Sequence, residues 1–156
     1  MVTVARIETG DSKITIDEVK SYIHLIGNER DDELQVMLET AIAAVEDYCN
    51  ISLRPTTWKL SQDLATDNQK LFYPPVIEVV SINDYDGSQL QYKVLQDIVY
   101  IDTASSFICT YKTGEAEDAN RYKAAVLAYT GLLFDGNDDN NSFNIVMSRY
   151  LPYRML

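Results

Sequence analysis

Histidine and cysteine are scarce in this sequence, which has one histidine and two cysteines in 156 residues. His24 has no evident sequence partner for a catalytic triad or a zinc site. Cys49 and Cys109 lie far apart in hydrophobic contexts, which favours reduced, buried thiols in a cytoplasmic product over a disulfide scaffold. P-loop, nucleophile-elbow and dinucleotide-binding motifs are absent from the sequence. We therefore expect no enzyme, with no catalytic residues, no cofactor and no metal.

Basic residues are also few, with 13 Lys and Arg against 24 Asp and Glu and a formal net charge of −11. Such a surface repels phosphate on average, which argues against nucleic-acid binding through a basic patch. The acidic residues are spread over segments such as 29–33 and 115–118, a pattern typical of solvated faces and loops.

Long apolar runs are missing, since no stretch approaches the roughly 18 residues that a membrane-spanning helix needs. The first residues, MVTVARIETGDSK, lack the basic and then apolar regions of a signal peptide. We expect neither membrane insertion nor export. The length suits one domain, and 46% hydrophobic with 24% charged residues is an ordinary globular composition.

Two helices are predicted in the first 50 residues. Thr15 and Glu18 in the segment T-I-D-E form a capping-box pattern, and Gly27 is a residue type that commonly ends a helix, so the first helix is placed at 16–26. The second is placed at 32–49, with Asp31 or Asp32 as its cap. Its apolar stripe consists of Leu34, Leu38, Ala41, Val45 and Tyr48.

The segment after Pro55 is rich in Thr, Val, Ile, Tyr and Phe, with turn residues between short runs, which predicts strands. These are placed at 57–60, 70–73, 76–82, 89–95, 99–101 and 107–112. The segment D-Y-D-G at 84–87 is typical of a hairpin turn.

A third helix is predicted at 118–134, because acidic residues precede an apolar stripe and suit the positive end of the helix dipole. Turn-forming residues at 135–142 then predict a loop. The spacing of its acidic residues imitates a calcium loop, but Asn140 stands where such a loop needs glycine and Val146 where it needs glutamate. A solvated loop is the better interpretation, followed by a hydrophobic tail at 143–156.

Together these elements predict an α+β fold that is mainly helical. We expect a three-helix core, a β-hairpin-rich insertion at about 56–113 between the second and third helices, and a C-terminal docking tail, all in one domain of residues 1–156.

The order of these pieces resembles the gp6-like head-tail connector family of tailed bacteriophages. The motifs that carry the likeness are T-I-D-E-V-K at 15–20, D-D-E-L at 31–34, A-I-A-A-V-E-D-Y at 41–48, L-R-P-T-T-W at 53–58, Y-P-P-V at 73–76, D-Y-D-G at 84–87, Y-K-T-G at 111–114 and L-P-Y-R at 151–154. The long Asp/Asn loop at 135–142 departs from the family pattern.

This resemblance implies a structural virion protein, made in the bacterial cytoplasm. It implies an adaptor ring of about twelve copies beneath the portal protein, joining the DNA-filled head to a neck or tail protein and letting DNA pass. A stopper or tail-completion protein of the neck is the alternative in the same class. A small acid-base hydrolase is the alternative from another class, although carboxylates alone are too common to indicate one.

A ring of identical subunits needs two different faces that meet. Tyr122, Ala125 and Tyr129 on the third helix are the candidates for the ring interface, and the second helix has an apolar stripe wide enough to contribute. The alternative is that both helices pack on each other inside the subunit. Whether the acidic charge lines the lumen or the outer wall is open.

Two further contact sites are predicted. The C-terminal tail, with Tyr150, Leu151, Pro152, Tyr153 and Arg154, supplies aromatic and arginine anchors that could dock on the portal or on a neighbouring subunit. Packing of the tail on its own domain is the alternative. The hairpin turn formed by Asp84, Tyr85, Asp86 and Gly87 is a candidate contact for a neck protein, or else a plain exposed turn.

Overall fold

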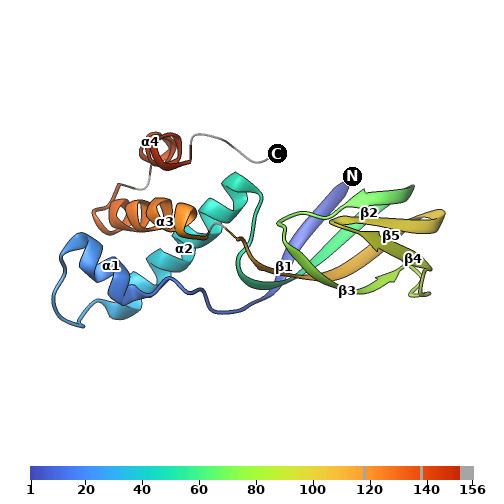
Figure 1. The fold of residues 1–156 in the computed structure, drawn as a ribbon, viewed down its shortest axis with the longest axis horizontal. Coiled ribbons are helices and arrows are strands. Elements are labelled where there is room, and N and C mark those ends of the chain that lie inside the picture. Colours follow the sequence, from blue (N-terminus) through green and yellow to red (C-terminus); the bar gives the residue numbers. More distant parts are fainter. Residues whose placement is uncertain (118, 138, 152–156) are drawn as a thin grey trace. The chain divides into compact units, whose positions relative to one another are not determined.

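The computed structural model describes residues 1–117, 119–137 and 139–151 (Figure 1). The chain divides into two compact units, which we call the sheet unit (Met1–Asp11 and Ile51–Ala116) and the helical unit (Ser12–Asn50 and Glu117–Leu156). The elements in chain order are β1 (Val2–Thr9), α1 (Ile16–Ile23), α2 (Asp31–Cys49), β2 (Leu53–Lys70), β3 (Val76–Asn83), β4 (Tyr92–Leu95), β5 (Ile98–Glu115), α3 (Ala119–Phe134) and α4 (Asn140–Tyr150). The single-domain organisation stays a prediction.

The mainly helical fold class is wrong. The described residues are 36% helix and 39% strand, with a five-stranded antiparallel sheet and four helices. Two strands of 18 residues, β2 and β5, replace the short runs expected from the sequence. A strand that the sequence reading missed, β1, joins them from the N-terminus, so the sheet is not a simple insertion.

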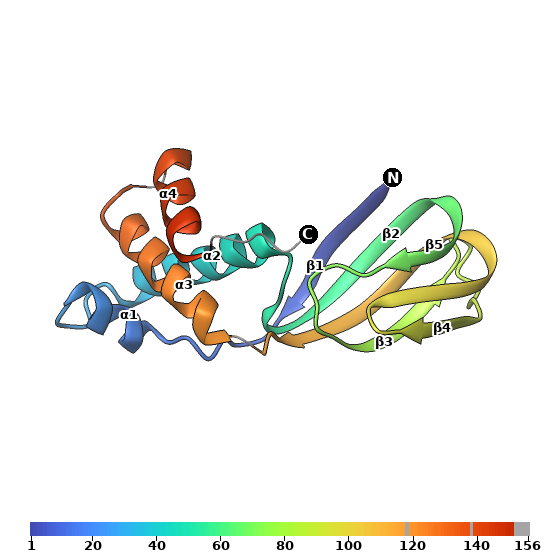
Figure 2. The same cartoon turned by 45° about the horizontal axis from the view of Figure 1, so that its top comes forward.

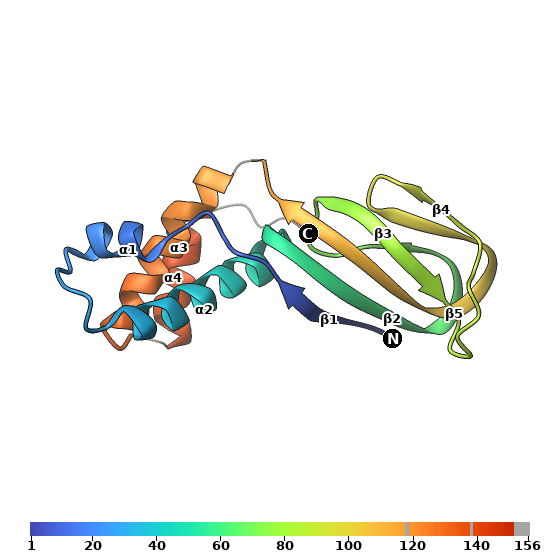
Figure 3. The same ribbon diagram turned by 90° about the horizontal axis from the view of Figure 1, so that it is seen from below.

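The sheet is organised around the pairing of β2 with β5, which lie side by side along their length (Figure 3). The strand order is β1-β2-β5-β3, and β4 pairs with the first part of β5. Irregular register between Gln62 and Asn68 interrupts the ladder. The polar run at 61–69, which separates two of the predicted strands, belongs to β2, because β5 offers it backbone partners.

The inner face of the sheet holds the core of this unit. Trp58 is paired with Tyr111 and Leu60 with Cys109, and all four side chains are buried. Alternation places every second residue of each strand on this face, and fully burying one such large side chain stabilises the fold by roughly 1.5–3 kcal/mol. Cys109 is a free, buried thiol, as the sequence predicted, and burial raises its pKa to about 12, which favours the neutral form.

The buried hydroxyl of Thr113 on β5 is hydrogen-bonded to polar side chains of this core. The indole Nε1–H of Trp58 donates to Thr113 Oγ1 at 2.7 Å. Ser52 Oγ shares a hydrogen bond of 2.7 Å with the same oxygen, and Ser52 also donates to the Tyr73 carbonyl at 2.7 Å. The Trp58 ring stacks on Tyr73 with centroids 4.1 Å apart. Thr113 thus links three segments of the sheet unit.

The helical unit begins with the predicted capping box, which the structure confirms: the Glu18 N–H donates to Thr15 Oγ1 at 3.4 Å and the Thr15 N–H to Glu18 Oε1 at 3.3 Å. The helix ends three residues earlier than expected, because His24 takes the left-handed conformation (φ 58°) that we assigned to Gly27. Lys123 on α3 forms an ion pair with Glu18 on α1, which links the two helices. The hydrogen bond from Lys123 lowers the pKa of the Glu18 carboxyl.

The central helix of this unit is α3, which packs against α1, α2 and α4 (Figures 1 and 2). Gly131 lies at the contact with α1, and a Cβ there would come within 3.3 Å of Ile23 Cγ2. An alanine at position 131 would therefore need the Ile23 side chain to move by a few tenths of an ångström. The helices expected at 16–26, 32–49 and 118–134 correspond to α1, α2 and α3.

The expected three-helix core is wrong, because a fourth helix, α4, forms at the start of the predicted C-terminal docking tail. Asp139 caps α4, because its Oδ1 accepts from the Ser142 N–H at 2.7 Å, and this hydrogen bond lowers the pKa of the carboxyl. Phe143 then meets Tyr129 edge-on with centroids 5.1 Å apart, and Tyr48 at 6.0 Å. The loop predicted at 135–142 thus ends at Asp139, and the residues that follow pack on their own unit.

Replacing Thr113 by Val tests the buried hydroxyl network. The change leaves the Trp58 indole N–H without its acceptor, so we expect the free energy of unfolding to fall by about 1–3 kcal/mol in urea titrations. Thr110→Val on the same strand is the matched control, because that half-buried threonine lies outside the network, and its effect should stay within about 0.5 kcal/mol. Equal stability of the two variants would contradict the assignment.

Candidate functional site

The ring-interface candidates on α3 are placed in the interior of the helical unit. Tyr122, Ala125 and Tyr129 are all buried, with Val126 beside them. Their burial favours the alternative in which this stripe packs inside the subunit, since a buried side chain offers little surface to a neighbour. A role in a ring interface stays a prediction for these three residues.

The predicted docking tail lies only partly in the structure. Tyr150 is half-buried at the end of α4 and Leu151 is buried, with its N–H donating to the Met147 carbonyl at 2.8 Å. Pro152, Tyr153 and Arg154 lie outside the described residues. The part of the tail that is described therefore packs on its own chain, and docking stays a prediction.

The hairpin turn at 84–87 is exposed at the end of β3. Asp84 Oδ1 accepts from the backbone N–H groups of Asp86 at 3.0 Å and Ser88 at 2.9 Å, so the aspartate holds the turn in shape. Gly87 supplies the positive φ (91°) that the turn needs. Tyr85, at the tip of the turn, is 50% exposed. The turn is thus a rigid projection with one free aromatic ring, and its contact with a neck protein stays a prediction.

The helical unit also has a surface groove that the sequence did not indicate. A cavity of about 270 Å³ lies among α1, α3 and α4, with Tyr22, Leu132, Ile145 and Arg149 in its lining. Tyr22 is 45% exposed and Ile145 58% exposed, so apolar surface faces the solvent here. Burial raises the pKa of the Tyr22 phenol, and a hydrogen bond with Tyr150 raises it further. We call this feature the α1/α3/α4 groove.

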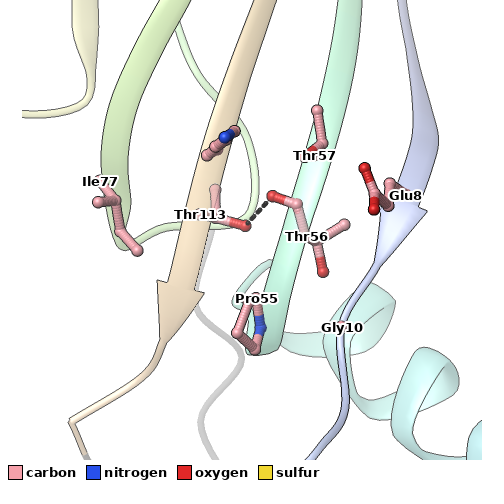
Figure 4. A pocket seen from close by; sticks show the side chains of 8 residues that line it. Glu8, Gly10, Pro55, Thr56, Thr57, Ile77 and Thr113 are labelled. Atoms are coloured by element: carbon pink, nitrogen blue, oxygen red, sulfur yellow. Dashed lines mark hydrogen bonds between the residues drawn. The ribbon is translucent and has the colours of Figure 1, made fainter.

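A second cavity, also of about 270 Å³, lies at one end of the sheet (Figure 4). Glu8 on β1 and Ile77 on β3 stand on its two sides, with Thr57 on β2 and Thr113 on β5 between them. Its acidic and basic lining residues, one Glu and one Lys, belong to different strands, and histidine and cysteine are absent from the lining. The side chains around it provide no nucleophile with an adjacent base.

Catalytic or metal chemistry finds no support in the part of the chain that the structure describes. Within it, no group of three or more His, Cys, Asp or Glu side chains is placed to hold a metal ion. His24 is exposed at the end of α1, where its backbone caps the helix. No helix among the described residues is long and apolar enough to cross a bilayer.

The comparisons with known proteins found matches to the fold of this chain but none to its sequence. No protein-family model matches the sequence, and no curated protein matches it either. The fold does match chains in solved structures of gene transfer agent (GTA) particles. A chain in the "neck of empty GTA particle computed with C6 symmetry" has a TM-score of 0.73 at 14% identity, covering 99% of this chain and 96% of that one.

Two other GTA structures agree. A chain in the "virion of native gene transfer agent (GTA) particle" has a TM-score of 0.71 at 17% identity, covering 98% of this chain and 95% of that one. A chain in the "neck of native GTA particle computed with C12 symmetry" has a TM-score of 0.59 at 15% identity, covering 96% of both. The TM-scores and coverages show a fold shared with chains of the GTA neck and virion structures, and identities of 14–17% show no more than the fold. Membership of the gp6-like family stays a prediction.

Replacing Tyr129 by Ala separates a core role from an interface role. If the side chain belongs to the core, the free energy of unfolding falls by about 3–5 kcal/mol at every protein concentration, because a cavity forms beside Phe143. Urea unfolding at several concentrations measures this, with Tyr85→Ala in the exposed turn as the control. An interface residue would instead leave the unfolding of the dilute subunit unchanged and weaken only its assembly.

Proposed function

We propose that this chain is a structural subunit of the neck of a tailed phage or phage-like particle. In this role it forms a ring below the portal, links the DNA-filled head to the tail and lets DNA pass. The protein is a virion component and not an enzyme. The fold likeness to GTA chains agrees with that interpretation.

The observation that carries the proposal is the extent of the likeness. The match to the neck chain covers 99% of this chain and 96% of that one, so the likeness spans both compact units of this chain and nearly the whole of the other. A likeness limited to one helical hairpin or one sheet would carry no such argument, because such parts recur in unrelated proteins. The ordered motifs of the sequence point to the same class independently.

The ring is proposed to contain about twelve copies. Two of the matching necks were computed with C6 and C12 symmetry, and cyclic symmetry of a neck requires repeated subunits. A ring of subunits that each carry a formal charge of −11 holds DNA only weakly. Weak attraction suits a channel, since phosphates bound to a basic wall would slow the passage of DNA.

The partners proposed are the portal protein on one side and a neck or tail protein on the other. Tyr150, Leu151, Pro152, Tyr153 and Arg154 are the proposed portal anchors. Leu151 is buried against its own chain and Tyr150 is half-buried, whereas Pro152, Tyr153 and Arg154 lie outside the described residues. The rigid turn at 84–87, with its exposed Tyr85, is the proposed contact for the neck or tail protein.

The mass of the purified protein with and without the portal tests the proposal. We expect recruitment of about twelve copies by the portal, measured by native mass spectrometry or light scattering over a range of concentrations. Salt should also be varied, because like charge opposes assembly of the free subunits and is screened by salt. A subunit that stays monomeric at every concentration and ignores the portal would overturn the adaptor role.

Removing residues 152–156 tests the docking tail. The truncation spares α4 and its buried Val146 and Met147, so the unfolding curve should match that of the intact protein. We expect binding to the portal to weaken by at least about tenfold, since aromatic and arginine anchors at interfaces often contribute 1.4 kcal/mol or more. The matched control is Tyr85→Ala, which should leave portal binding unchanged. Full portal binding by the truncated protein would contradict the tail assignment.

A further inference from the structure

A ring of identical subunits needs two different surfaces on each copy that fit one another. The α1/α3/α4 groove has the character of one of them. Ile145 and Tyr22 leave apolar surface exposed there, and Ala128 and Leu132 line the groove from α3. Arg149 is the one charged residue in the lining, which contains no carboxylate. An occupant should therefore combine an apolar side chain with negative charge.

The outer face of α2 has that combination. Asp32, Val36, Glu39 and Ala43 follow one another at helical spacing and so share one face of the helix. Val36 is 66% exposed and is the one large apolar side chain of α2 that is exposed. The two carboxylates flank it, one turn before and one turn after. We call this set the α2 stripe.

We propose that the α2 stripe of a second copy of this chain docks in the α1/α3/α4 groove. The inference rests on the proposed ring and deepens it by naming the two surfaces that meet. Val36 enters among Tyr22, Leu132 and Ile145, and the carboxylates on either side of it face Arg149. Burial of the apolar groups drives the contact, and the charges set its register and its choice of partner.

Charge complementarity is the reason for choosing a second copy as the occupant. A subunit with a net charge of −11 repels another copy on average. A contact between copies is therefore favoured where a basic side chain of one copy meets acidic side chains of the other. The groove and the α2 stripe do this, and both lie in the helical unit. Because the two surfaces differ, each copy uses its stripe on one neighbour and its groove on the other. Such a contact repeats around a ring, whereas contact of a surface with itself stops at a dimer.

Paired cysteines at the two surfaces test the contact. In the double variant Val36→Cys with Ile145→Cys, mild oxidation should link copies into a ladder of covalent oligomers on a denaturing gel. Each single variant can form covalent dimers at most. The native Cys49 and Cys109 are fully buried and should not contribute. The control is Val36→Cys with Asn120→Cys, which moves the second thiol to an exposed position on α3, about two turns before the groove residue Ala128.

Charge reversal provides the second readout in the full-length protein. Arg149→Glu and Glu39→Arg should each weaken assembly by at least about tenfold, because they set like charges against one another. The double variant should restore assembly, since the pair is present again with the signs exchanged. Both changed positions are exposed, so the unfolding curves of the two single variants and the double variant should match that of the unchanged protein.

The outcomes distinguish this contact from the function it rests on. If the unchanged protein forms rings, but the cysteine pair gives no ladder and the charge reversals have no effect, the docking contact is overturned and the ring proposal stands. If Arg149→Glu abolishes portal binding while ring assembly persists, the groove belongs to the portal and the contact is likewise overturned. If the unchanged protein forms no ring even with its portal, both proposals fail.

Discussion

The pairing of β2 with β5 is the constraint on which the sheet unit depends. Each strand is 18 residues long, so one ladder supplies backbone partners to both halves of the sheet. Outer strands are then added on either side, β1 along β2 and β3 along β5. The same ladder brings Trp58 to Thr113, so the buried indole N–H finds its acceptor. The outer strands contribute to the sheet only once this ladder exists.

The helical unit combines a mostly apolar interior, in which Glu46 of α2 is buried, with an acidic exterior. Around α3 the buried residues are apolar or hydrogen-bonded, and the carboxylates of α2 that flank Val36 lie on the solvent side. A protein of this kind gains solubility from its charge and loses easy self-association. In the proposed ring, contacts between copies then depend on the few surface positions where a basic side chain lies among acidic ones. In the proposed contact between copies, Arg149 is such a basic side chain.

The helices were predictable from sequence because their signals are local. The capping box at Thr15 and Glu18 needs only four residues to be recognised. The strand β1 was missed, although Val2 and Val4 alternate with polar or small residues, because its partner β2 begins more than 40 residues later. Asp139 was taken for part of a loop since the same residue types favour turns and helix caps. The groove joins helices from opposite ends of the chain, and no local pattern encodes it.

The division of the chain has a consequence for how the protein folds. Each unit is assembled from two separated segments, and the chain passes from one unit to the other three times. During synthesis β1 leaves the ribosome first, yet the sheet it belongs to is complete only after β5. The helices α1 and α2 likewise wait for α3. Such long-range contacts slow folding and leave an unpaired strand exposed in the nascent chain. Neither unit can therefore be obtained intact by trimming one end of the chain.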